Sequence, residues 1–194
     1  AEESRVLFVG SSRAQNDLTV GRGFRSFGRN LKSGRTYIRN KRRKNAAQTE
    51  IGRADDYDVY SLVHSKNIYD IDAKLLQTKL ADFVMARTQS VVAKQNTDDD
   101  YVYDIFVQSD LETWVGQFSK SLNSDLFNIK SNLEYSQRRG LPKEIRHLKL
   151  VGLSTVASSE AEDPTSEARN LTSCFQNSGI WCVPIITGFP TIFF

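Results

Sequence analysis

The chain has few of the residues that build disulfide frameworks, metal centres and acid–base sites. Its 194 residues include only two cysteines and two histidines. Seven residues separate Cys174 from Cys182 and no histidine lies near them. This spacing supports neither a disulfide scaffold nor a zinc site. A reducing intracellular location is therefore the default expectation.

Long apolar runs and catalytic constellations are also missing. No apolar run approaches the roughly 18 residues that a membrane helix needs, and the N-terminus lacks the charged-then-apolar pattern of a secretory signal. His64 and His147 have no Cys, Ser or carboxylate beside them in a recognisable arrangement. Gly21-Arg22-Gly23 lacks the remainder of a phosphate-binding loop. We therefore expect no membrane partner, no cofactor and no enzymatic activity.

Charge is distributed unevenly along the chain. Residues 1–53 carry 13 Lys and Arg against 4 Asp and Glu, a net charge of +9, whereas residues 54–194 carry 13 against 19, a net charge of −6. From Arg22 to Lys44 there are ten basic residues and no acidic one. Such an asymmetry indicates interaction with a polyanion, with an acidic groove of another protein, or with the acidic part of the chain itself.

The basic stretch closes with the cluster Lys41, Arg42, Arg43 and Lys44. This cluster is typical of a signal read by a nuclear-import receptor, which binds extended basic peptides. Contact with the phosphates of nucleic acid is the second interpretation, and a solvated arm is the third. The aromatic residues in the stretch, which could stack on bases, are Phe24, Phe27 and Tyr37.

Hydrophobic residues make up 39% of the chain, which is low for a compact domain of this size. We therefore expect a mostly irregular or partly disordered chain with short helices and short strands. Its expected parts are a basic flexible arm at 1–53, a middle segment at 54–125 with two helices, and an atypical C-terminal region at 126–194.

Hydrophobic spacing suggests where the ordered elements lie. Apolar residues recur at three and four positions over 72–94, which predicts a helix with Asp70 or Asp72 as its N-cap. Ser109 and Glu112 have the spacing of a capping box, which predicts a second helix at 110–122. Short strands are expected at 5–9 and 57–63, and residues 148–187 have the outline of a small βαβ unit.

The most distinctive segment runs from Asp98 to Val107. Its alternation predicts a strand with Tyr101, Tyr103 and Ile105 on one side and Val102, Asp104 and Phe106 on the other. The three consecutive carboxylates that precede it suit a solvated turn better than a site for a hard cation, because they alternate direction on an extended chain.

This segment, with Trp114 behind it, resembles the signature of the eukaryotic RNA polymerase II nuclear-localisation adaptor family. The resemblance spans roughly residues 4–120, although residues 126–194 replace the acidic tail of the family. It implies a non-enzymatic adaptor that binds RNA polymerase II, presents residues 41–44 to an importin and shuttles between nucleus and cytoplasm. The residues that the resemblance assigns to polymerase binding are Asp99, Asp100, Tyr101, Val102, Tyr103, Asp104, Ile105, Phe106 and Trp114.

Two alternatives stay open beside the adaptor. The basic residues at 22–44 suit a nucleic-acid-binding protein, whose affinity would fall steeply with salt. The unit at 148–187 suits a fragment of a small α/β domain, which would unfold cooperatively.

Overall fold

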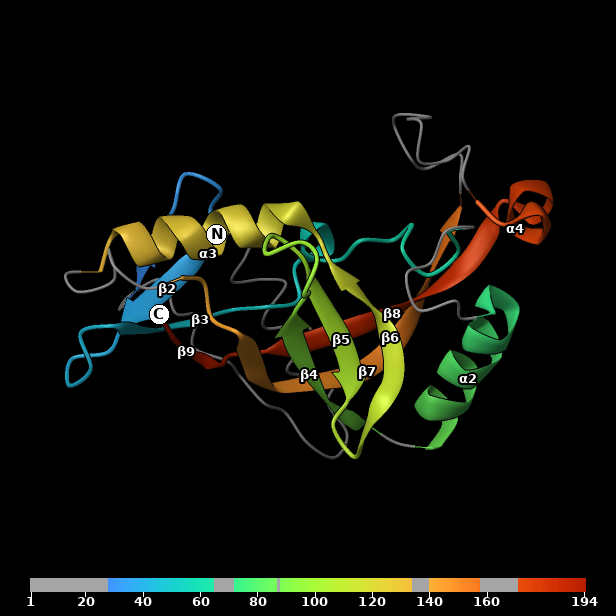
Figure 1. Cartoon of the computed structure of the whole chain (residues 1–194), viewed down its shortest axis with the longest axis horizontal. Helices are drawn as coiled ribbons and strands as arrows, with labels where there is room; N and C mark the ends of the chain where they lie inside the picture. The colour runs from blue at the N-terminus through green and yellow to red at the C-terminus, as the bar shows by residue number, and fades with distance from the viewer. Residues whose placement is uncertain (1–27, 65–71, 87, 134–139, 158–170) are drawn as a thin grey trace, which may run out of the picture.

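The structure is a computed structural model that describes residues 28–64, 72–86, 88–133, 140–157 and 171–194. Within these ranges the chain forms two antiparallel sheets (Figure 1). The small sheet has the strand order β1-β2-β3-β9 and the large sheet has the order β6-β5-β4-β7-β8. The expected short strands are present, but the expectation of a mostly irregular chain with short helices is wrong for the described residues, in which strands predominate.

The small sheet contains β1 (Arg29–Asn30), β2 (Thr36–Arg39), β3 (Ala46–Thr49) and β9 (Thr191–Phe193). The large sheet contains β4 (Gln89–Gln95), β5 (Tyr103–Val107), β6 (Asp110–Phe118), β7 (Glu144–Ala157) and β8 (Ile180–Gly188). The helices are α2 (Ala73–Ala86), α3 (Lys120–Ser131) and α4 (Ser173–Ser178), and η2 (Ala54–Asp56) is a short 3-10 turn.

The distinctive segment supplies β5, which confirms the predicted strand over Tyr103–Val107. This strand lies between β4 and β6 in the large sheet. The side chains of Tyr103, Asp104 and Ile105 are all buried, so both faces of the strand are covered. The side of β5 that carries Tyr103 and Ile105 is therefore packed in the core.

The helix predicted at 72–94 is correct at its start and wrong at its end. The Asp72 carboxylate accepts hydrogen bonds from the backbone N–H groups of Lys74 and Leu75 (2.8 and 3.3 Å), as expected of an N-cap. The helix α2 ends at Ala86, and residues 89–95 form β4 instead. Val91 matched the helical spacing, but adjacent β-branched residues favour a strand once they can pair with neighbouring strands.

The helix predicted at 110–122 is a strand, β6, followed by the first turn of α3. The Asp110 carboxylate accepts hydrogen bonds from the Glu112 N–H (3.1 Å) and the Thr113 hydroxyl, so it closes the β5–β6 hairpin. Gly116 pairs with Ile105 and Trp114 with Phe106, which leaves Val115 as an extra, bulged residue. Because a bulge breaks the alternation of a strand, its apolar residues acquired the spacing of a helix.

The βαβ unit predicted at 148–187 is also wrong. Strands β7 and β8 pair antiparallel, with Leu148 opposite Gly188 and Val156 opposite Trp181, whereas a βαβ unit requires parallel strands. Of the strand predicted at 57–63, only Tyr57 makes a bridge, to Phe118, and the next residues form turns. The strand predicted at 5–9 lies outside the described residues.

Part of the predicted flexible arm is folded. Residues 28–53 supply β1, β2 and β3, and β3 pairs with β9 through Ala46 opposite Phe193. Figure 1 shows α3 running from the large sheet to the small sheet. Leu122, Leu126 and Ile129 on its inner side are fully buried, so α3 covers core that both sheets share.

Gly116 is a position at which only glycine fits. Its φ is +131°, and a methyl group there would collide with the Tyr57 hydroxyl, which donates a 2.6 Å hydrogen bond to the Val115 carbonyl. Gly116→Ala is therefore expected to lower the free energy of unfolding by about 3 kcal/mol, measured by urea denaturation. Gly152→Ala is the control, since its methyl would meet only Ile185 at an ordinary 3.6 Å. Equal losses in the two variants would contradict the close approach at Gly116.

Tyr103 should make stability depend on alkaline pH. Burial raises the pKa of Tyr103 above its ordinary value, and the charge of Asp100 adds to this effect. Its contribution is complete below the unfolded-state pKa of about 10, and stability falls as pH rises above that value because only the unfolded chain ionises. In Tyr103→Phe, which also loses a hydrogen bond to the Pro142 carbonyl, we expect a shallower fall in urea-unfolding free energy between about pH 9.5 and 11. Parallel curves for both proteins would contradict this account.

Candidate functional site

The residues assigned to polymerase binding divide into a buried and an exposed group. Tyr103, Asp104, Ile105 and Trp114 are buried in the large sheet. Val102 and Phe106 are half-buried, as is Asp99, whereas Asp100 and Tyr101 are exposed. At the surface of the folded chain, the segment therefore offers mainly the turn that precedes β5.

Asp104 and Trp114 belong to a buried hydrogen-bond network. The Asp104 carboxylate accepts from Trp114 Nε1 (3.0 Å), Gln117 Nε2 (2.8 Å) and Asn96 Nδ2 (2.7 Å). A buried carboxylate is costly unless such donors surround it. One carboxylate thus joins β5, β6 and the β4–β5 loop. This hydrogen bonding explains the distinctive spacing of Asp104 and Trp114 in structural terms.

The three carboxylates before β5 lie in a tight turn. Asn96 Oδ1 accepts from the N–H groups of Asp98 (2.7 Å) and Asp99 (3.1 Å), and Asp99 Oδ1 accepts from the Tyr101 N–H (2.8 Å). These bonds match the predicted turn. They also hold Tyr101 at the surface, where 63% of the residue is exposed.

The cluster Lys41–Lys44 forms the tip of the hairpin that connects β2 and β3, which we call the basic hairpin (residues 40–45). Asn40 Oδ1 accepts from the N–H groups of Arg42 (2.9 Å) and Arg43 (3.0 Å), and the Asn40 N–H donates to the Ala46 carbonyl (2.9 Å). Lys41, Arg42, Arg43 and Lys44 are all exposed. The turn thus presents four cationic side chains from a backbone that is fixed by hydrogen bonds.

Further groups surround the basic hairpin. The Arg39 guanidinium donates to the Asn132 carbonyl at the end of α3, which holds hairpin and helix together. The Arg43 guanidinium lies 5.2 Å from the centroid of the Phe193 ring, and 46% of Phe193 is exposed. Residues 28–53 contain nine Lys and Arg and a single acidic residue, Glu50. The small sheet is therefore a strongly basic part of the molecule.

One arginine of this region, Arg35, is buried and holds the small sheet in place. Its guanidinium donates to Asp125 Oδ2 on α3 (2.7 Å), to the carboxylate of Asp56 in η2 and to the Glu50 carbonyl (2.8 Å). Arg35, Asp56 and Asp125 are all at least 97% buried. Burial lowers the pKa of Arg35, but the hydrogen bonds and charges of the two aspartates outweigh it and the pKa lies above its ordinary value.

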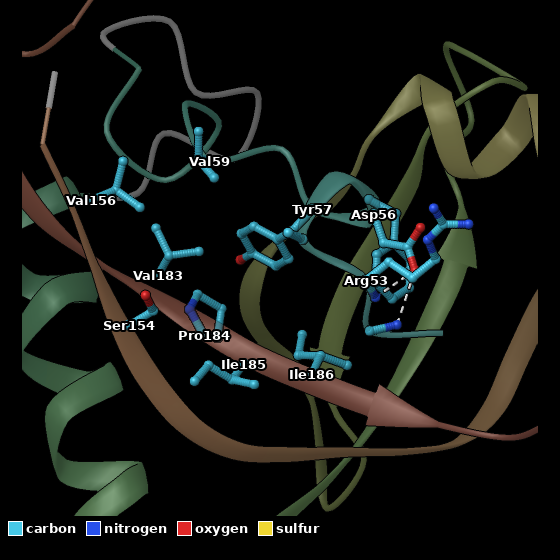
Figure 2. Close-up of a pocket in the computed structure, with 13 residues that line it drawn as sticks. Arg53, Asp56, Tyr57, Val59, Ser154, Val156, Val183, Pro184, Ile185 and Ile186 are labelled. Atoms are coloured by element: carbon cyan, nitrogen blue, oxygen red, sulfur yellow. Dashed lines mark hydrogen bonds between the residues drawn. The ribbon is translucent and has the colours of Figure 1, made fainter. Parts of the chain in front are cut away.

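An apolar cavity of about 350 Å³ lies between η2 and the paired strands β7 and β8 (Figure 2). Its walls include Val156, Val183, Pro184 and Ile186. Asp56 at its edge is already bonded, by Arg35 and by the N–H groups of Gly52 and Arg53 (2.9 and 3.0 Å). The cavity walls are mostly apolar, and among the lining residues that the structure describes no nucleophile is hydrogen-bonded to a base.

Within the described ranges, no three His, Cys, Asp or Glu side chains gather as ligands for a metal ion. In the same parts of the chain, no helix is both long and apolar enough to cross a membrane. Asp98, Asp99 and Asp100 therefore carry no metal assignment.

Comparison with protein-family models, with curated proteins and with solved structures finds no match to this chain. The fold and site together define a two-sheet antiparallel protein with a basic hairpin. The resemblance to the RNA polymerase II adaptor family stays a prediction.

Sequence reasoning missed two exposed aromatic residues beside the basic region, Phe127 and Phe193. Phe127 lies on the outer face of α3 among Ser124, Asn128 and Ser131. An aromatic residue within an otherwise polar helix face is a readable signal, but only once the helix is placed at 120–131. Because the helix was predicted at 110–122, Phe127 lay outside it and this signal was not recognised.

Loss of Arg35 should destabilise the whole molecule. Arg35→Met leaves Asp56 and Asp125 buried without a countercharge, so we expect the free energy of unfolding to fall by about 3–5 kcal/mol. Arg35→Lys should lie between this variant and the parent, because lysine keeps the charge but not the planar fork. Urea denaturation measures both changes.

Arg146→Met is the control for this prediction, since Arg146 is an exposed arginine paired with Glu144 (2.7 Å). Its removal should change stability little. A loss in Arg35→Met no larger than that in Arg146→Met would contradict the structural role of the buried charges.

Proposed function

We propose that the protein binds nucleic acid, with the basic hairpin as its main contact to phosphates. The observation that carries the proposal is the exposure of four consecutive cationic side chains on one fixed turn. Lysine and arginine on a folded surface release counterions from the phosphate backbone, which supplies affinity without sequence preference. The exposed Arg29 and Lys32 of the same basic region extend the positive surface.

The shape of the hairpin favours phosphates over an import receptor. Import receptors take basic peptides in an extended form, whereas residues 41–44 lie in a turn closed by the Asn40 and Ala46 backbone groups. Receptor binding would require these hydrogen bonds to open. A polyanion can bind the turn as it stands, so little ordering cost opposes association.

The adaptor for RNA polymerase II stays a second proposal, and so do its importin partner and its shuttling between nucleus and cytoplasm. Its support is the exposed Tyr101 with the acidic turn before it. Tyr101→Ala is the variant that would test polymerase capture in a nuclear extract, because a change at the buried Tyr103 would also damage the fold. Both proposals describe a binding protein rather than an enzyme.

Replacing Lys41, Arg42, Arg43 and Lys44 by glutamine should weaken binding to a fluorescein-labelled oligonucleotide. We expect roughly a tenfold or larger loss of affinity at about 0.1 M salt, measured by fluorescence anisotropy. The slope of log K against log salt should become shallower by about 3, since each lost phosphate contact on a single strand removes about 0.7.

The matched control removes four positive charges from another surface. Lys74 and Lys79 on α2, Lys143 just before β7 and Lys149 on β7 are all exposed. Their replacement by glutamine changes the net charge by the same amount but should leave most of the affinity and the salt slope intact. If both quadruple variants lose the same affinity, the contact is a general charge effect and the hairpin is not the site.

A further inference from the structure

A notch beside the basic region is lined by two exposed aromatic rings. Tyr101 from the β4–β5 loop and Asn123, Ser124, Phe127 and Asn128 from α3 enclose a surface hollow of about 310 Å³. We call it the aromatic notch. Tyr101 is 63% exposed and Phe127 is 53% exposed. Two large rings that are each more than half exposed at one hollow form a surface on which a flat molecule can stack.

Asn123 joins the two sides of the aromatic notch. Asn123 is 2% exposed, and its Nδ2 donates to the Tyr101 carbonyl, which ties the β4–β5 loop to α3. Its Oδ1 is buried and has no hydrogen-bond partner among the described residues. An oxygen buried to this degree is out of reach of a ligand, so the role of Asn123 is to hold the Tyr101 loop and α3 in one arrangement.

A line of contacts connects the aromatic notch to the basic hairpin. Lys130 Nζ lies 5.8 Å from the centroid of the Phe127 ring, and two residues further along the chain the Asn132 carbonyl accepts the hydrogen bond from Arg39. Arg39 directly precedes the hairpin. From Phe127 to Ser131 the helix rises only about 6 Å. The stacking rings and the cations that would contact phosphates therefore lie within reach of one short nucleic-acid strand.

The charges around the notch favour one path for a nucleic-acid strand across the surface. Asp98, Asp99 and Asp100 directly precede Tyr101 in the turn of the β4–β5 loop, and their negative charges repel phosphates. Lys130 and the hairpin lie at the C-terminal end of α3. The favourable path for a phosphate backbone leads from the notch toward the hairpin and away from the acidic turn.

We propose that the aromatic notch binds an unpaired base of a single-stranded nucleic acid whose phosphates contact Lys130 and the basic hairpin. This inference rests on the proposed function and adds its substrate class. In a duplex the faces of the bases are covered by their neighbours, so the two rings have no base to stack on. Single strands should therefore bind more tightly than duplexes of the same length.

The test separates the contribution of the bases from that of the phosphates. The full chain is titrated into labelled oligonucleotides of about 12 residues, a site size typical of single-strand binders. The probes are a DNA strand, an RNA strand, a DNA duplex and an abasic DNA strand that keeps its phosphates. The variants are Tyr101→Ala with Phe127→Ala, the conservative pair Tyr101→Phe with Phe127→Tyr, and Leu75→Ala as an exposed apolar control on α2.

The parent should bind the base-containing single strands about fivefold or more tightly than the abasic strand, and the double alanine variant should bind the two equally. The salt slope of the double alanine variant should match that of the parent, because no phosphate contact is lost. The conservative pair and Leu75→Ala should behave as the parent does.

Two negative results have different meanings. Unchanged affinity of the double alanine variant for every probe, together with weakened binding of the hairpin variant, overturns the aromatic notch and leaves the proposed function standing. The absence of salt-dependent binding by the parent to any probe overturns the proposed function and the notch with it.

Discussion

The buried charge cluster of Arg35, Asp56 and Asp125 is the interaction on which the arrangement of the candidate interface depends. Arg35 lies just before β2, Asp56 lies in η2 and Asp125 lies in α3, and Arg35 and Asp125 are 90 positions apart in the chain. A buried guanidinium with two carboxylates is weak evidence for extra stability, because desolvation offsets much of the attraction. Its geometry nevertheless restricts how the elements can pack, since any displacement of the small sheet from α3 would leave charges buried and unpaired.

That restriction brings two surface features into one place. The basic hairpin follows β2, which Arg35 fixes against α3, and the aromatic notch uses the outer face of the same helix. The inner face of α3 is apolar and buried, so the helix cannot rotate without exposing Leu122, Leu126 and Ile129. Arg39 at the end of β2 adds a second connection through Asn132. The positive charges and the stacking rings are therefore held near each other by the core of the protein.

The sequence predicted the features that depend on neighbouring residues. The prediction of Asp70 or Asp72 as a helix cap includes the residue that caps α2, Asp72. The strand at 103–107 and the turn at 98–100 are also as predicted, because each is decided within a few positions along the chain. The basic cluster at 41–44 was equally visible, although its hairpin shape was not. That shape depends on the pairing of β2 with β3 and on the pairing of β3 with β9, which lies almost 150 residues later in the chain.

The errors have physical causes that lie in long-range pairing. In β6 the extra residue Val115 shifted the apolar positions to a helical spacing, so a strand resembled a helix and α3 was overlooked. With α3 misplaced, Phe127 could not be assigned to an exposed face, and the aromatic notch had no sequence signal. The unusual pattern of Asp104 and Trp114 was read as a partner surface. In the folded chain these two residues bond to each other inside the large sheet.

The most direct test is to map where a single-stranded oligonucleotide binds on the folded protein. Backbone amide chemical shifts, followed by NMR while a short single-stranded oligonucleotide is added, report which residues the ligand reaches. We expect the residues with the largest chemical-shift changes to form one continuous surface. This surface should cover the basic hairpin at 40–45, the end of α3 at 127–132 and the turn at 99–101. Changes confined to the apolar cavity around 52–59 and 183–186, or changes scattered without relation to α3, would contradict this expectation.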